Sequence, residues 1–317
     1  MNHICCIGEA LIDMICTDKG MPLSQGEHFL KKAGGAPTNV AAAIAALGGK
    51  ATLLACVGAD PFGQHLLQVM ESFGVDTSFT TQSNTHFTTL AFVSLMHNGE
   101  RDFYFNRGAD AMLDEATVNT LPVNNYSIIH FGSATAFLPG PLQTAYYTML
   151  QRAMASHCFI TFDPNYRQLL FGHQQELFKQ HAWHYLKNCQ FFKVSDEEAL
   201  LLTATQHLTD AVTALKQATE ATFAITLGKE GTLLCHNKQT STIPSIPITP
   251  VDTTGAGDAF TGAVLRQLQQ FERQHMHNLT IQQWQDIISK ANKAGAHTCE
   301  YMGAMEAFRH LSAQILA

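Results

Sequence analysis

The sequence has few charged residues, and what is missing from it narrows the choice of function. Only 14% of the 317 residues are charged and the net charge is −7, so the chain offers no excess of positive charge for binding nucleic acid. No apolar run approaches the roughly 20 residues of a membrane-spanning helix. The apolar N-terminal run is interrupted by Glu9 and Asp13 and has no basic lead, which argues against a signal peptide. We therefore expect a soluble, cytoplasmic protein without a nucleic-acid or membrane partner.

Disulfide and metal-binding patterns are missing as well. The eight cysteines are scattered without a Cys-x-x-Cys pair, and most lie in apolar, strand-like runs. We therefore expect buried, reduced thiols. Sixteen histidines are also dispersed, and the pairs His181/His184 and His275/His277 have no evident third ligand. The hydrophobic fraction of 46% supports a sizeable core, in one large α/β domain or two smaller ones.

A glycine-rich stretch, Asp252–Gly262, lies between a β-branched segment and an apolar helical pattern. It matches neither G-x-x-x-x-G-K-[ST] nor G-x-G-x-x-G, which argues against a P-loop NTPase and a dinucleotide-binding fold. Gly255 and Gly257 carry no Cβ, so an anion can approach the unpaired N–H groups at the positive end of the helix. The Asp258 carboxylate would repel that anion, so its presence there needs an explanation. Accepting a proton from a hydroxyl that attacks the bound anion would explain it. The alternative is a plain helix start with an aspartate cap.

A second glycine turn opens an alanine-rich helix within Ala33–Gly49. Gly34 and Gly35 allow the backbone to approach a ligand, and Asn39 offers a donor and an acceptor for hydroxyl groups. The alternative is a helix start capped by Thr38 or Asn39. Asp13 follows the first apolar strand, at the edge where α/β sheets bind ligands; its alternative is a solvated turn residue.

Strands and helices alternate along most of the chain, which predicts a mostly parallel sheet with right-handed crossovers. Asn98-Gly99 between Thr88–Leu95 and Arg101–Asn106 predicts a β-hairpin. With residues 14–33, this hairpin is expected to form a small inserted lobe, over about 14–33 and 86–107. Aromatic residues on its second strand, Phe103 among them, either face a ligand or pack within the lobe.

Two motifs together resemble the signatures of the ribokinase-like (PfkB) carbohydrate kinases. They are Gly34–Ala41 (GGAPTNVA) and Asp252–Phe260 (DTTGAGDAF). The resemblance extends from Gly8 to Ala304. It implies one doubly wound α/β kinase domain over residues 1–317, with a small inserted β lid that closes over a sugar.

The resemblance also implies a role for each matching residue. Asp258 matches the catalytic base, and Gly255, Ala256 and Gly257 match the anion hole for the transferred phosphoryl group. The implied sugar contacts are Asp13, Gly34, Gly35, Asn39, Phe103, Arg107, Asn165 and Arg167. The implied ATP contacts are Lys193, Thr226, Gly228, Gly231 and Asn292.

The same resemblance implies that two metal ions bind. Glu198 matches the end of an Asn-x-x-Glu element that organises Mg²⁺ through water, although Ser195 stands at the asparagine position here. Ser195 and Glu198 also fit a helix capping box. Asp252 and Thr254 match a monovalent-cation loop, which implies K⁺.

The identity of the sugar substrate is implied by four motifs that together resemble those of bacterial fructokinases. They are Gly8–Asp13, the first signature, Phe103–Arg107 and Asp163–Arg167, and they imply ATP-dependent phosphorylation of D-fructose to fructose 6-phosphate. 2-Keto-3-deoxygluconate kinase stays open because Arg107 and Arg167 could hold a carboxylate. Aminoimidazole riboside kinase and adenosine-type nucleoside kinases also stay open. A non-catalytic sugar sensor is disfavoured by the intact Gly-Ala-Gly-Asp. The exposed lid sheet is a candidate homodimer surface.

Overall fold

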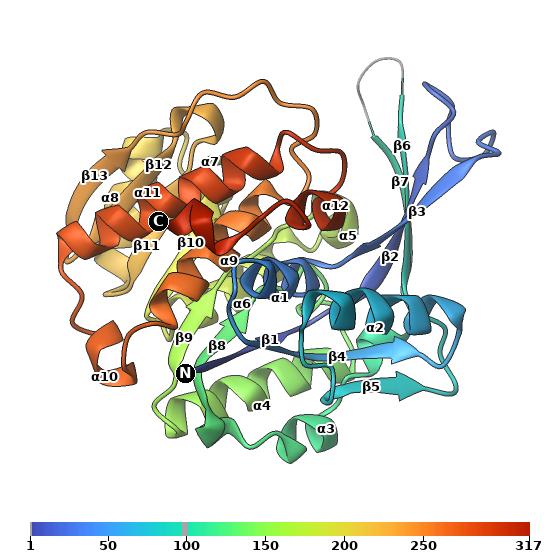
Figure 1. The fold of residues 1–317 in the computed structure, drawn as a ribbon, viewed down its shortest axis with the longest axis horizontal. Helices are drawn as coiled ribbons and strands as arrows, with labels where there is room; N and C mark the ends of the chain where they lie inside the picture. Colours follow the sequence, from blue (N-terminus) through green and yellow to red (C-terminus); the bar gives the residue numbers. More distant parts are fainter. Residues whose placement is uncertain (1, 97–100) are drawn as a thin grey trace.

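The structure is a computed structural model that describes residues 2–96 and 101–317 (Figure 1). The turn predicted at His97–Glu100 lies outside the described residues. Two sheets organise the chain: a nine-stranded sheet in the main body and a separate four-stranded sheet. Within the described ranges, no helix combines the length and hydropathy needed to cross a bilayer.

The large sheet has the order β13-β12-β11-β10-β9-β8-β1-β4-β5. Its first seven strands in sequence are parallel to one another, and β12 and β13 add an antiparallel edge. This confirms the predicted doubly wound, mostly parallel architecture. The strands are β1 (His3–Ile7), β4 (Ala51–Gly58), β5 (Thr80–Ser83), β8 (Tyr126–Phe131), β9 (Phe159–Phe162), β10 (Phe191–Ser195), β11 (Thr222–Thr226), β12 (Thr232–His236) and β13 (Gln239–Ile243).

The central strands are apolar along both faces because helices cover both sides of the sheet. Every residue of β4 and of β8 is buried, as expected of parallel strands packed between two layers. Alternate side chains enter different cores: Leu53 belongs to one apolar cluster and Leu54 to the other. The strand pattern therefore dictates two cores, one on each face.

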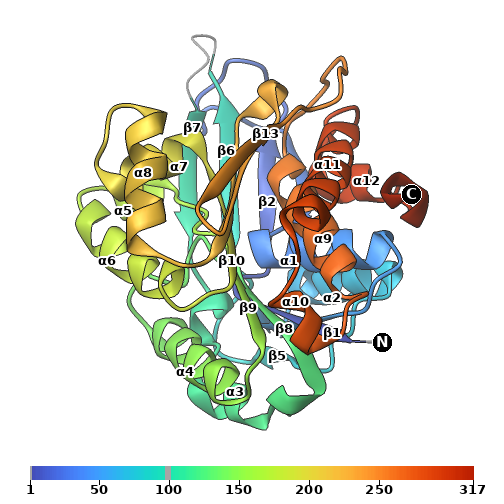
Figure 2. The same cartoon turned by 90° about the vertical axis from the view of Figure 1, so that its left-hand side faces the viewer.

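Figure 2 shows the two helical layers on opposite sides of the large sheet. One layer contributes to the first core and consists of α1 (Ala36–Ala46), α2 (Pro61–Phe73), α9 (Ala256–Leu268), α10 (Arg273–Met276), α11 (Ile281–Thr298) and α12 (Ala304–Phe308). The other contributes to the second core and consists of α3 (Glu115–Thr120), α4 (Pro141–Ala155), α5 (Gln168–Phe171), α6 (Gln175–Leu186), α7 (Asp196–Thr203) and α8 (Leu208–Ala218).

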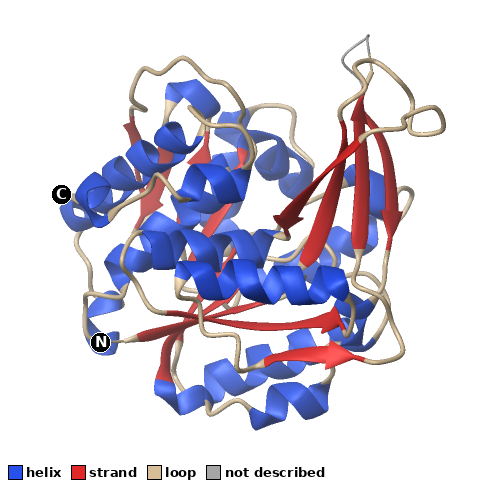
Figure 3. Cartoon of the chain, turned by 45° about the vertical axis from the view of Figure 1, so that its right-hand side comes forward, coloured by secondary structure: helices blue, strands red, loops and turns tan. Residues whose placement is uncertain are grey.

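The small sheet projects from the main body (Figure 3) and has the order β3-β2-β6-β7. Its strands β2 and β6 pair in parallel, with Asp13 opposite Ala91, whereas the outer pairs are antiparallel. The strands are β2 (Leu11–Cys16), β3 (Phe29–Gly34), β6 (Leu90–Leu95) and β7 (Arg101–Asn106). Most of them fall in the two segments expected to form a lid, and that function stays a prediction.

Some local details differ from what the sequence pattern suggests. Asp13 is not the solvated turn residue of the alternative interpretation, because a new strand begins at Leu11 and includes it. The segment after α11 is not one helix: α12 ends at Phe308, and Ser312 is extended, with φ −148°, while Leu311 packs into the core. The two edge strands, β5 and β13, were not expected because their sequences are largely polar.

Candidate active site

The two glycine motifs meet at the carboxyl ends of the parallel strands. Asp258 lies in the first turn of α9, and its Oδ2 accepts a hydrogen bond of 2.8 Å from Asn39 Nδ2 on α1. Asn39 is buried, and its Oδ1 has no partner among the described residues. A carboxylate and an unsatisfied acceptor therefore face the same space, as a site for a hydroxyl-bearing ligand requires.

The helix α9 begins with a backbone turn that only glycine fits. Gly255 is its N-cap with φ 83°, in the left-handed region. A Cβ on Gly255 would lie 2.5 Å from Ala304 Cβ. The Ala256 N–H donates to the Thr253 carbonyl oxygen at 3.2 Å. The turn presents the next first-turn N–H groups, those of Gly257 and Asp258, at the positive end of the helix, where an anion is stabilised.

On the opposite side of the site, Asp13 lies over the start of α1. A Cβ on Gly34 would lie 2.2 Å from Asp13 Oδ2, and a Cβ on Gly35 (φ 103°) would lie 2.4 Å from the Glu9 carbonyl oxygen. Both glycines are thus needed for close packing against β2 and the residues before it. The structure therefore brings Asp13, Asn39 and Asp258 to one site.

The pKa values of both aspartates are raised toward neutral pH. Burial raises the pKa of Asp258 to about 6, against the lowering effects of the Asn39 hydrogen bond, Lys193 and Arg167. Burial also raises the pKa of Asp13 to about 6, with Arg167 opposing and Asp258 adding to the rise. A carboxylate with such a pKa is a stronger base than a solvated one.

We expect activity to fall on the acid side of neutrality. Asp258 must be ionised to accept a proton, so kcat/KM should be high above its pKa of about 6 and fall as the pH drops through that value. Because Asp13 and Asp258 interact, the fall of kcat/KM on the acid side reports an apparent pKa that belongs to the pair of carboxylates. The measurement is the pH profile of kcat/KM at saturating ATP. A profile flat down to pH about 4, the range of an unperturbed aspartate, would contradict the assignment.

A buried cation, Lys193, lies on β10 close to the same helix turn. Its Nζ donates to Asp163 Oδ2 at 2.9 Å, and both side chains are buried. The sequence reasoning named Lys193 but missed Asp163. The signal for it was present, because an acidic residue directly follows the apolar strand β9 and Lys193 lies on the adjacent parallel strand β10.

The loop after β9 carries two predicted sugar contacts. Asn165 has φ 48°, and its Oδ1 accepts from Arg167 Nη2 at 3.3 Å. Its buried Nδ2 has no partner among the described residues. Arg167 is exposed, yet its charge lowers the pKa of both Asp13 and Asp258. The loop therefore places a free donor and a cation at the site.

The remaining predicted sugar contacts lie on or after the small sheet. Phe103 is half-buried on β7 and stacks on Phe105 with ring centroids 6.2 Å apart. Arg107 donates to the Pro139 and Thr135 carbonyl oxygens at 2.9 and 3.2 Å and approaches Asp110 at 3.5 Å. Arg107 thus ties the end of the small sheet to the main body, and its contact with a sugar stays a prediction.

The predicted nucleotide contacts occupy two places. Thr226, Gly228 and Gly231 lie at the end of β11 and in the turn to β12. Asn292 lies on α11, where its Nδ2 donates to the Ile243 and Pro244 carbonyl oxygens at 3.1 and 3.2 Å. The Asn292 amide is thus engaged within the protein, and its contact with a nucleotide stays a prediction.

The predicted ion-site residues are engaged with backbone N–H groups. Glu198 accepts from the backbone of Tyr166 and of Ser195, each at 2.8 Å, and completes the predicted capping box with Ser195. Asp252 accepts from the backbone of Thr254 at 3.0 Å and of Gly303 at 2.8 Å. The described ranges hold no cluster of three or more His, Cys, Asp or Glu suited to a metal. Glu198 thus fits an ion held through water better than a directly ligated one.

Glu9 has a structural role that sequence reasoning did not assign. Its buried carboxylate accepts from the backbone of Ala36 at 3.1 Å, from the backbone of Ala134 at 3.2 Å and from the Ser133 hydroxyl. These bonds fix the start of α1 against the segment after β8. Glu9 therefore braces the sugar side of the site without facing it.

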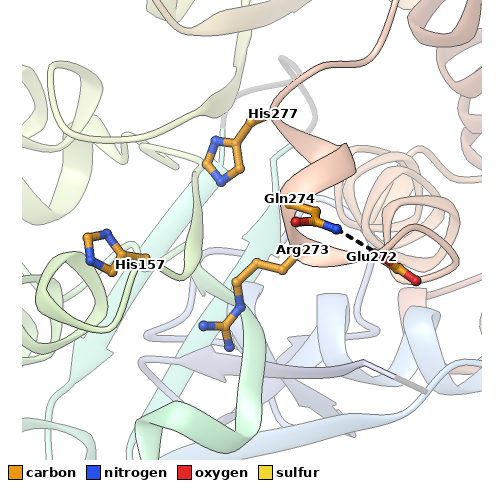
Figure 4. Close-up of a pocket in the computed structure, with 5 residues that line it drawn as sticks. All are labelled: His157, Glu272, Arg273, Gln274 and His277. Atoms are coloured by element: carbon orange, nitrogen blue, oxygen red, sulfur yellow. Dashed lines mark hydrogen bonds between the residues drawn. The ribbon is translucent and has the colours of Figure 1, made fainter.

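Two hollows lie at the opposite ends of the strands from Asp258. One, of about 450 Å³, is lined by His157, Glu272, Arg273, Gln274 and His277 (Figure 4). The other, of about 590 Å³, includes residues at the starts of β9 and β11. Arg273 already donates to the Ser156 carbonyl oxygen at 2.9 Å. None of the predicted site residues lines either hollow.

Comparison with known proteins identifies the family of this chain. Residues 1–310 match the model of the pfkB family carbohydrate kinases. Fructokinase-1 of Oryza sativa subsp. japonica is 33% identical over 301 residues, covering 94% of this chain and 92% of the relative.

Solved structures give the same result. A double mutant of the Vibrio cholerae O395 fructokinase, bound to fructose, ADP and potassium ion, matches with a TM-score of 0.85 and 27% identity over 100% of this chain and 97% of that one. The ATP-bound fructokinase of Xylella fastidiosa matches with a TM-score of 0.86 and 27% identity, over 99% and 96% of the two chains. The predicted kinase activity is therefore confirmed at the level of the family: this chain belongs to the pfkB family of carbohydrate kinases.

Proposed function

We propose that the protein is an ATP-dependent fructokinase that converts D-fructose to fructose 6-phosphate. The observation that carries the proposal is the meeting of the two glycine turns, with Asp258 hydrogen-bonded to Asn39 beside the N-terminus of α9. The site thus combines a base, an anion site and polar groups for hydroxyls. The similar proteins described above, all fructokinases, support fructose as the sugar.

The residues divide the work of phosphoryl transfer between two sides. Asp13, Asn39 and Asn165 orient the sugar so that its reacting hydroxyl lies next to Asp258. Asp258 then accepts the hydroxyl proton as the oxygen attacks the terminal phosphoryl group of ATP. The N–H groups of the turn at Gly255–Gly257 stabilise the negative charge on that group. Positioning and charge stabilisation are sufficient for this reaction, so no covalent intermediate is needed.

Two cations complete the proposal. Glu198 would hold, through water, the Mg²⁺ that accompanies ATP, and this ion would supply positive charge to the phosphates. Asp252 and Thr254 would hold K⁺ in the loop that directly precedes Gly255. Positive charge there would favour the turn conformation that directs the anion-hole N–H groups toward the phosphoryl group.

The test of the sugar is a substrate panel. Purified protein receives ATP and Mg²⁺ with fructose, ribose, 2-keto-3-deoxygluconate, aminoimidazole riboside or adenosine, and ADP release is measured. We expect fructose to give the highest kcat/KM. A higher value for another member reassigns the sugar, and turnover of none would support a non-catalytic sugar sensor.

The K⁺ assignment predicts an ion-dependent rate. In tetramethylammonium buffer, kcat should fall by about tenfold relative to K⁺ buffer, because the turn at Gly255 loses part of its electrostatic stabilisation. Asp252→Asn should weaken the response to K⁺. Equal rates in the two buffers at the same ionic strength would refute the assignment.

We also propose a homodimer through the small sheet. Ile15, Leu30 and Leu95 are 36%, 44% and 60% exposed, and the strand register places Ile15 opposite Leu30 and on the face of Asp13. A second copy of the sheet would cover this apolar surface. Light scattering after size exclusion should give twice the chain mass for the wild type and a shift to monomer for Leu30→Glu. A monomeric wild type at micromolar concentration would contradict the proposal.

A further inference from the structure

A buried ion pair lies beneath the first turn of α9. Lys193 is on β10, and Asp163 directly follows the parallel neighbour β9, in which Phe162 pairs with Phe192. Lys193 Nζ lies 2.9 Å from Asp163 Oδ2, and the two residues are 7% and 0% exposed. The division of work proposed above gives Asp163 no task.

The ammonium group of this ion pair lies next to the anion site. A Cβ added to Gly257 would lie 3.0 Å from Lys193 Nζ, so the ammonium group is held directly against the turn that carries the anion hole. Asp163 Oδ2 is also 3.5 Å from Thr261 Oγ1, one turn further along α9. Asp163 therefore bridges strand and helix and fixes the direction in which Lys193 points.

An anion bound at this turn would make the arrangement more favourable. A cation at the N-terminus of a helix is repelled by the positive end of the helix dipole. Removing the ammonium group from water adds a desolvation cost, which only a good partner offsets. Asp163 supplies that partner, and an anion at the same turn would remove the remaining repulsion. The geometry is thus suited to a ligand with negative charge next to Gly257.

We propose that Asp163 is a positioning residue for phosphoryl transfer, holding the Lys193 ammonium group where it neutralises charge on the phosphoryl group in the anion hole. The inference rests on the kinase reaction proposed above but not on which sugar is used. Lys193 keeps its proton in this place: burial acts to lower the pKa of Lys193, but the carboxylates of Asp163 and Glu198 raise it above the usual range.

The pair also acts on the base. Lys193 lowers the pKa of Asp258 and Asp163 raises it. The other groups that face the base are fixed in both variants considered below: they are Asn39 on α1, Asp13 on β2 and Arg167 in the loop after β9. Loss of the Asp163 charge should therefore move the acid limb of kcat/KM to lower pH, and loss of the Lys193 charge should move it to higher pH. These shifts report the electrostatic contact between the pair and the base, whereas the split between kcat and sugar KM described below reports a role in phosphoryl transfer.

The experiment compares Asp163→Asn, Lys193→Met and the double variant, each assayed on whichever sugar of the panel the wild type phosphorylates best. We expect kcat to fall about 100-fold or more in Lys193→Met and about tenfold or more in Asp163→Asn, with sugar KM nearly unchanged. Since Asp163 acts through Lys193, the double variant should match Lys193→Met within about threefold. Glu220→Gln, which breaks a surface ion pair with Lys238, is the control and should keep wild-type kcat.

Several results would overturn the inference. Wild-type kcat in Asp163→Asn is one, and a double variant whose loss is the product of the two single losses is another. If Asp163→Asn does not fold because it leaves an ammonium group unpaired, the double variant decides, since it buries neither charge; wild-type kcat in it would exclude the role. Failure of fructose as substrate bears only on the proposed sugar, because the comparison uses the sugar that the wild type accepts.

Discussion

Asp258→Asn is expected to lower kcat by about a thousandfold, because the variant loses the group that accepts the hydroxyl proton. In the wild type, Asn39 Nδ2 donates to the Asp258 carboxylate at 2.8 Å. The amide oxygen of the variant has the same shape as the lost carboxylate oxygen and can still accept this hydrogen bond. The sugar should therefore bind nearly as before, with its KM changed by about threefold or less. Steady-state kinetics with varied sugar at saturating ATP measure both constants.

The control for this variant is Asp114→Asn. Asp114 is the N-cap of α3 and accepts from the Thr117 backbone at 2.8 Å, so the change removes a carboxylate at a helix start away from the site. It should keep wild-type kcat and lose only a small amount of stability. If Asp258→Asn retained kcat close to that of the control, another group would have to be the base.

Gly255→Ala is expected to damage both stability and catalysis. The new methyl group would lie 2.5 Å from Ala304 Cβ, and alanine would have to adopt φ 83°. Such a backbone costs about 1–3 kcal/mol, and relief of the clash must move the turn that forms the anion hole. Loss of one well-placed donor typically lowers kcat by about 100-fold or more. Thermal denaturation and steady-state kinetics measure the two effects.

Gly74→Ala separates strain from steric damage. Gly74 also has φ 83°, but a Cβ there would meet nothing within 4 Å. It ends α2, outside the site. This control should lose about 1 kcal/mol of stability from the backbone alone and keep wild-type kcat. If the two alanine variants were equally stable and equally active, the close approach of Ala304 to the turn would have no functional weight.

The parts of the fold that sequence predicted best are those with local signals. Helix α1 follows from the alanine-rich run after the second glycine turn, and α7 follows from the capping box at Ser195. The buried strands follow from apolar runs. Strand β13 could not be predicted in this way, because Gln239–Ile243 is largely polar and pairs only at the sheet edge.

The site could be predicted only where a residue has a recognisable neighbourhood in the sequence. Asp258 stands in a glycine turn and Asn39 in another, but their hydrogen bond joins residues 219 positions apart. Asp163 and Lys193 pair because β9 and β10 lie side by side, which depends on strand order. Asn292 matched a nucleotide contact, yet the structure uses its amide to hold the chain after β13. Long-range pairing is set by tertiary packing, so local sequence does not encode it visibly.

The parallel pairing of β2 with β6 has a consequence for engineering. The small sheet is assembled from two excursions of the chain, Leu11–Gly34 and Leu90–Asn106, whose inner strands join at Asp13 and Ala91. Neither excursion carries a complete sheet, so this unit cannot be transplanted into another protein as one contiguous cassette. Replacement of either excursion alone would leave the other with an unpaired inner strand, an edge that favours aggregation. A chimaera with altered sugar preference would therefore have to exchange both excursions together.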